Sequence, residues 1–87
     1  MGEIMAELIQ EFAEVVRDAR GREYVASVYG EERGGTWEGW IEFRPLAGLG
    51  PALRTGRETT QPDRGALEYW ATGLEPVYLE GALARAA

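Results

Sequence analysis

The first part of the chain has large apolar side chains at a spacing typical of an α-helix. They recur every three or four residues over residues 4–19, and the acidic residues of this segment lie mostly between them. Gly21 follows, and glycine is a common helix stop. The pattern predicts an amphipathic helix whose apolar stripe packs against the core or is shared with another subunit. The stripe consists of Ile4, Met5, Leu8, Ile9, Phe12, Val15, Val16 and Ala19.

The spacing then changes to one that predicts a β-hairpin. Residues 22–32 and 36–44 alternate between apolar and polar positions, and a pair of glycines between them suits a two-residue turn. Pairing Arg33 with Thr36 places all the inner apolar side chains on one face, whereas a slip of one residue would scatter them. That inner face consists of Tyr24, Ala26, Val28, Trp37, Ile41 and Phe43.

The same register places two glycines opposite each other. Gly30 faces Gly39, and glycine inside a strand often marks a bulge or the close approach of another element. A third strand is expected over residues 52–59, after a loop rich in glycine and proline. If Leu53 pairs with Phe43, this strand completes a three-stranded antiparallel meander.

The rest of the chain predicts two helices. Residues 60–63 combine a hydroxyl, a proline and an acid, which is typical of a helix start. Gly73 ends this helix, and Pro76 begins a shorter one. The expected fold is α+β, in the order α-β-β-β-α(-α), with the helices packed on one face of the meander. Residues 1–87 form a single domain.

The composition excludes many kinds of chemistry. Histidine, cysteine, lysine and asparagine are all absent, so the usual zinc, haem and iron–sulfur sites and a cysteine or histidine-based nucleophile cannot form. We predict no catalytic residue, metal or cofactor. The net charge of −6 makes broad nucleic-acid binding unlikely by electrostatics. Arginine without lysine or asparagine suits either a heat-adapted protein or a GC-rich genome, and both explanations stay open.

The apolar runs are too short to cross a bilayer, and the N-terminus lacks the positive start of a secretory signal. We therefore expect a cytoplasmic protein without a membrane segment. A domain of 87 residues without disulfides or a metal has a small core, and such domains often gain stability from a partner subunit. This favours a homo-oligomer, with a different protein as a possible partner.

Two segments are candidates for function. The outer face of the sheet and the first helix together predict a contact surface of Tyr29, Trp40, Ile4, Leu8 and Phe12. The polar stretch between the third strand and the next helix predicts an anion or ligand site of Arg54, Arg57, Thr59, Thr60 and Arg64. Acids in that stretch compete for the same donors, so a capped helix with local ion pairs is the alternative.

The expected function is a small non-enzymatic protein that acts through protein–protein contact, first with itself. The alternative is an RNA- or nucleotide-binding module, because aromatic and arginine side chains on a sheet face can stack bases. A small enzyme that uses the glutamates at the hairpin tip is a third class, but charges at such a tip are usually solvated.

Overall fold

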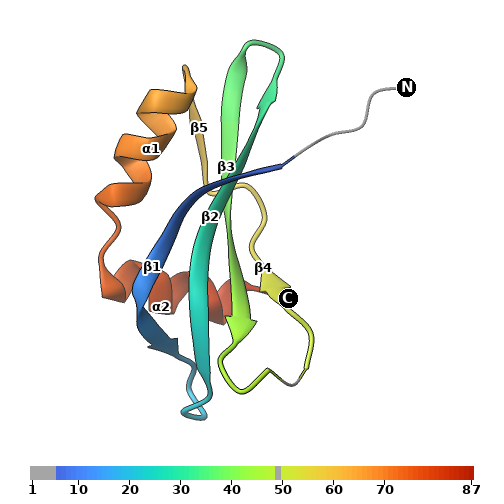
Figure 1. Ribbon diagram of the computed structural model, residues 1–87, viewed down its shortest axis with the longest axis vertical. Helices are drawn as coiled ribbons and strands as arrows, with labels where there is room; N and C mark the ends of the chain where they lie inside the picture. Colours follow the sequence, from blue (N-terminus) through green and yellow to red (C-terminus); the bar gives the residue numbers. More distant parts are fainter. Residues whose placement is uncertain (1–5, 49) are drawn as a thin grey trace.

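The computed structural model describes residues 6–48 and 50–87 and has an antiparallel sheet followed by two helices (Figure 1). The strands are β1 (Glu7–Arg17), β2 (Glu23–Arg33), β3 (Thr36–Pro45), β4 (Leu53–Arg54) and β5 (Thr59–Gln61). The helices are α1 (Arg64–Thr72) and α2 (Pro76–Arg85). Strands β1 to β4 are neighbours in chain order, and β5 also pairs with β3. The predicted α+β class is confirmed, but the order of elements is not the predicted one.

The segment that the sequence predicted as an amphipathic helix is the edge strand β1, so this prediction was wrong. Strand β1 pairs with β2, with Leu8 opposite Tyr29 and Val16 opposite Tyr24. Its register shifts twice, between Leu8 and Gln10 and between Glu11 and Val15. Each shift inserts extra residues and resets the alternation of a strand. Apolar residues three or four positions apart can therefore lie on the same face of the sheet. Their spacing then resembles that of an amphipathic helix.

The hairpin of β2 and β3 is confirmed in the predicted register. Arg33 faces Thr36, and the pairs continue one by one to Tyr24 and Pro45. The two glycines of the turn have φ of +62° and +91°, the left-handed region that such a turn requires. The inner face is buried under the helices and forms the core with side chains from α1 and α2. This core includes Val28, Ile41 and Phe43, and Ala71, Leu79, Ala82 and Leu83 from the helices.

The glycine pair is where α1 approaches the sheet most closely. A Cβ atom at Gly30 would lie 2.4 Å from Cδ2 of Leu67, and one at Gly39 would lie 2.7 Å from Cδ1 of the same residue. Leu67 is fully buried. Of the two expectations for this pair, a bulge or the close approach of another element, the close approach is therefore confirmed. The two missing side chains let α1 lie close to the sheet.

The third predicted strand forms in two short pieces. Leu53 faces Phe43 and Arg54 faces Glu42, as expected, but the ladder stops after β4 and resumes at β5. Thr55 accounts for the break, because its hydroxyl accepts the backbone N–H of Ile41 at 3.1 Å and donates to the carbonyl of Gly56 at 2.8 Å. A side chain thus replaces a ladder bond at this point.

Helix α1 begins later than the sequence suggested, and an acid caps it. The Asp63 carboxylate accepts the backbone N–H of Ala66 at 2.8 Å, while Thr60 and Gln61 belong to β5. Helix α2 begins at Pro76, as predicted. Neither helix, within the part of the chain that the structure describes, has the length and apolar character needed to cross a bilayer.

Replacing Asp63 by alanine is expected to lower the free energy of unfolding by about 1 kcal/mol, because the first turn of α1 loses its side-chain acceptor. Urea denaturation at pH 7 measures this change. Asp63→Asn is the matched control, since asparagine keeps a side-chain oxygen at the cap. Equal losses in the two variants would contradict a capping role.

Candidate functional site

The predicted contact residues on the sheet form a row across three strands. Leu8 pairs with Tyr29, and Tyr29 pairs with Trp40, on the face away from the helices. Leu8 is 49% exposed, but Trp40 is only 5% exposed. The guanidinium of Arg54 lies 4.5 Å from the centre of the Trp40 ring, and the indole N–H donates to Glu42 at 3.3 Å. Little of this tryptophan is therefore open to a partner.

The other two predicted contact residues do not join this row. Phe12 is partly buried and packs against the core on the helix side of the sheet. Ile4 lies outside the described residues. The shared surface that the sequence suggested depended on a helix, and β1 instead distributes its apolar side chains over both faces.

The predicted anion site is divided among separate ion pairs. Arg57 lies 3.6 Å from Glu38, and Arg64 lies 3.0 Å from Glu7 and also contacts Glu68. Arg54 stacks on the sheet face described above. Thr60 is exposed on β5, and the Thr59 hydroxyl accepts a hydrogen bond from Gln61 at 2.6 Å. These five predicted residues do not converge on one point, and the helix N-terminus beside them is already capped.

Most arginine side chains of the described chain form an ion pair with a nearby carboxylate. Seven of the nine arginines contact a carboxylate, Arg54 stacks on Trp40, and Arg20 forms no ion pair among the described residues. Several exposed glutamates have no ion-pair partner in the same residues, so the surface carries surplus acid. The seven pairs include Arg17–Glu23, Arg22–Asp18, Arg33–Glu31, Arg44–Glu11, Arg57–Glu38, Arg64–Glu7 and Arg85–Glu58.

A carboxylate that sequence analysis missed ties α2 to the sheet. The side chain of Glu58, only 10% exposed, accepts the Tyr78 hydroxyl at 2.6 Å and the Arg85 guanidinium at 2.7 Å. Burial alone would raise the pKa of Glu58, but the hydrogen bonds from Arg85 and Tyr78 outweigh it and lower the pKa below its usual value. The partners are 20 and 27 residues away, so no local pattern could predict this cluster.

An apolar groove lies between the bulged part of β1 and the corner where α1 meets α2. Its volume is about 170 Å³. Val15 on its wall is 37% exposed, and Val77, next to the groove residue Pro76, is 72% exposed. Glu14 and Glu80 belong to the lining, and neither forms an ion pair with another described residue. We call this surface the acidic groove; its residues are Phe12, Ala13, Glu14, Val15, Val16, Leu74, Pro76, Leu79 and Glu80.

Only part of the acidic groove could be found from the sequence. Phe12 was assigned to a contact surface, but its neighbours were placed on a helix. The bulge in β1 brings Glu14 and Val15 beside α2, and bulges leave no simple signature in a hydrophobic pattern.

No group of three or more histidine, cysteine, aspartate or glutamate side chains is placed to hold a metal ion within residues 6–48 and 50–87. No family model, curated protein or solved structure matches this chain. The contacts, burial and charges of the described residues are therefore the basis for assigning a function.

Proposed function

We propose that this chain is a non-enzymatic protein that acts through protein–protein contact, and that the acidic groove makes the contact. The observation that carries the proposal is the combination of an apolar groove with two acids, Glu14 and Glu80, that form no ion pair in the described chain. Exposed apolar surface that polar residues surround is typical of a contact site. The groove, at about 170 Å³, suits a side chain from a partner better than a small molecule, which usually takes roughly 300–1,000 Å³.

The partner that fits is a protein segment with an apolar side chain between arginines or lysines. The apolar side chain would lie against Val15 and Leu79, and the cations would face Glu14 and Glu80. The net charge of −6 also attracts a basic partner from a distance. A second copy would bring the same glutamates to the contact, so repulsion between like charges disfavours it.

Self-association at the groove is the second proposal, and one observation supports it. Val77, which follows the groove residue Pro76 in the chain, is 72% exposed. In a two-fold dimer, each Val77 could enter the groove of the other copy, because such an interface uses the same surface twice. RNA or nucleotide binding is less favoured, since Arg54 already stacks on Trp40 and the other arginines are mostly paired.

A short peptide of alternating leucine and arginine, labelled with a fluorophore, tests the first proposal by fluorescence anisotropy. Glu80→Arg is expected to weaken binding about tenfold at low salt, because it turns attraction into repulsion at the rim. Glu32→Arg is the matched control: it changes the net charge equally, but Glu32 lies on the hairpin and not in the groove. Equal weakening by both variants would show that only net charge matters and would contradict the proposal.

Light scattering distinguishes the two proposed occupants of the groove, because it measures whether the chain is a monomer or a dimer. A monomer that binds the peptide supports the basic partner. A stable dimer that Val77→Glu converts to a monomer would assign the groove to a second copy and contradict the first proposal.

A further inference from the structure

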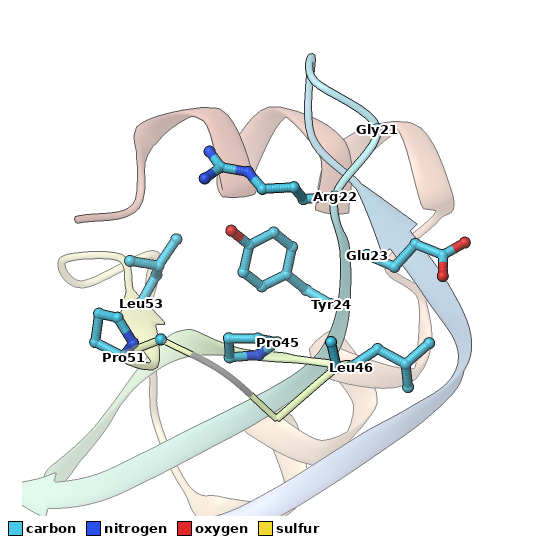
Figure 2. Close-up of a pocket in the computed structure, with 10 residues that line it drawn as sticks. Gly21, Arg22, Glu23, Tyr24, Pro45, Leu46, Pro51 and Leu53 are labelled. Atoms are coloured by element: carbon cyan, nitrogen blue, oxygen red, sulfur yellow. The ribbon is translucent and has the colours of Figure 1, made fainter.

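A second concave surface lies beside the β1–β2 turn, formed with the loop that leaves β3 (Figure 2). Its volume is about 640 Å³, which is within the usual size of a small-molecule site of roughly 300–1,000 Å³. Most of its wall is apolar. Figure 2 shows the ring of Tyr24 with Pro45, Pro51 and Leu53 around it. We call this surface the Tyr24 pocket; it is lined by Gly21, Arg22, Glu23, Tyr24, Pro45, Leu46, Ala47, Gly50, Pro51 and Leu53.

The hydroxyl of Tyr24 is available to a ligand. The residue is only 6% exposed, yet its hydroxyl forms no hydrogen bond with another described residue. In the described chain, no fully buried side-chain oxygen or nitrogen lacks a partner, so this hydroxyl keeps some exposed surface. Figure 2 shows it pointing toward the space between Arg22 and Leu53. A tyrosine buried in this way is a rigid donor at the end of an apolar wall.

Arg22 is held in place beside this hydroxyl. Its Nε donates to the Asp18 carboxylate at 2.8 Å, and the other carboxylate oxygen accepts the backbone N–H groups of Arg20 and Arg22, each at 2.9 Å. The two terminal nitrogens of Arg22 form no hydrogen bond among the described residues. Asp18 thus orients the guanidinium and leaves two of its donors free.

We propose that the Tyr24 pocket binds a small monocarboxylate with an apolar body. The carboxylate would accept hydrogen bonds from the terminal nitrogens of Arg22 and from the Tyr24 hydroxyl, a charge-assisted arrangement that suits a planar carboxylate. The apolar body would lie against Pro45, Leu46 and Leu53. This is a site separate from the acidic groove, and it does not depend on the function proposed there.

The charges around the pocket favour one negative charge on the ligand over two. Asp18 already balances Arg22, and a dianion such as phosphate would meet this carboxylate at close range. Glu23 opposes the ligand less, because its carboxylate pairs with Arg17 at 2.6 Å and points away from the Tyr24 ring in Figure 2. Arg20, exposed on the same turn, lines a second hollow that Arg22 and Tyr24 also line.

The test uses 4-phenylbutanoate and its neutral amide as probes, with binding followed by calorimetry and by the amide NMR signals of the full chain. The acid is expected to bind saturably and at least tenfold more tightly than the amide, with shifts at Tyr24, Leu46 and Leu53. Arg22→Gln is expected to weaken binding of the acid at least tenfold. Arg57→Gln, an arginine outside the pocket, is the control and should leave binding unchanged.

Tyr24→Phe is a second variant that should fold, because it keeps the buried ring and removes a hydroxyl that has no hydrogen-bond partner among the described residues. It is expected to weaken binding several-fold while the free energy of unfolding stays close to that of the wild type. The proposal is overturned if the acid does not bind at millimolar concentration, if acid and amide bind equally, or if both pocket variants bind like the wild type.

Discussion

Alanine in place of Gly30 is expected to lower the free energy of unfolding by about 1–3 kcal/mol, because the new methyl group overpacks the core. Its Cβ would lie 2.4 Å from Cδ2 of Leu67 and 3.1 Å from the backbone oxygen of Glu38. Leu67 is fully buried, so it has little room to move. Thermal unfolding would detect the loss, since about 1 kcal/mol shifts the midpoint by roughly 4–8 °C in a domain of this size.

A matched glycine separates overpacking from the general effect of alanine. A Cβ at Gly56 meets no atom within 4 Å, so Gly56→Ala is expected to be neutral or slightly stabilising. Leu67→Ala alone should cost about 2–5 kcal/mol through the cavity that it creates. When it is combined with Gly30→Ala, the new methyl partly fills that cavity, so the loss should be smaller than the sum of the single losses. Additive losses would contradict a direct contact between these two positions.

Replacing Glu58 by glutamine is expected to lower the free energy of unfolding by about 2 kcal/mol at pH 7. The variant loses the charge that Arg85 and Tyr78 share, in a position where the side chain is only 10% exposed. Urea denaturation measures the difference. Glu32→Gln, an exposed change on the hairpin, is the control and should have little effect.

The stability that Glu58 contributes should depend on pH in a definite direction. Its pKa in the folded chain lies below its ordinary value of 4.5, despite burial, because of the hydrogen bonds from Arg85 and Tyr78. The unfolded chain therefore takes up a proton first, and the contribution is complete above pH 4.5 and is lost as the pH falls through the lower folded value. The difference between wild type and Glu58→Gln should shrink below that pH. If wild type and Glu58→Gln differ in free energy of unfolding by the same amount above and below the folded pKa, the stabilising role of the Glu58 charge is contradicted.

Local pattern was sufficient for the hairpin, for the end of α1 at Gly73 and for the start of α2 at Pro76. Strict alternation and a two-glycine turn leave one register that places the inner apolar side chains of β2 and β3 on one face. The pairing of Gly30 with Gly39 followed from that register and indicated a bulge or a close approach, and Leu67 of α1 makes the close approach.

The same reasoning from local pattern could not predict that residues 7–17 form strand β1. A segment with apolar residues three and four apart satisfies a helix or a bulged strand equally well, and the choice depends on whether a neighbouring edge is available. The edge of β2 was available, and its residues from Glu23 to Gly30 pair with β1 with two irregularities. The contact surface predicted around Phe12 and Leu8 changed for this reason, because the two residues lie on opposite faces.

The polar sites depended even more on distant parts of the chain. The Arg57 and Arg64 side chains point to carboxylates on β3 and β1, and Glu58 is satisfied by a helix more than 15 residues away. The sequence shows that these charged residues are present but not which of them pair in the fold. Composition could therefore exclude metals that need histidine or cysteine and could indicate surplus acid. Packing between distant segments places part of that acid beside an apolar groove. It also brings Arg22 and Tyr24 to the wall of an apolar pocket, because residues 45–47 and 50–53 supply most of the remaining lining.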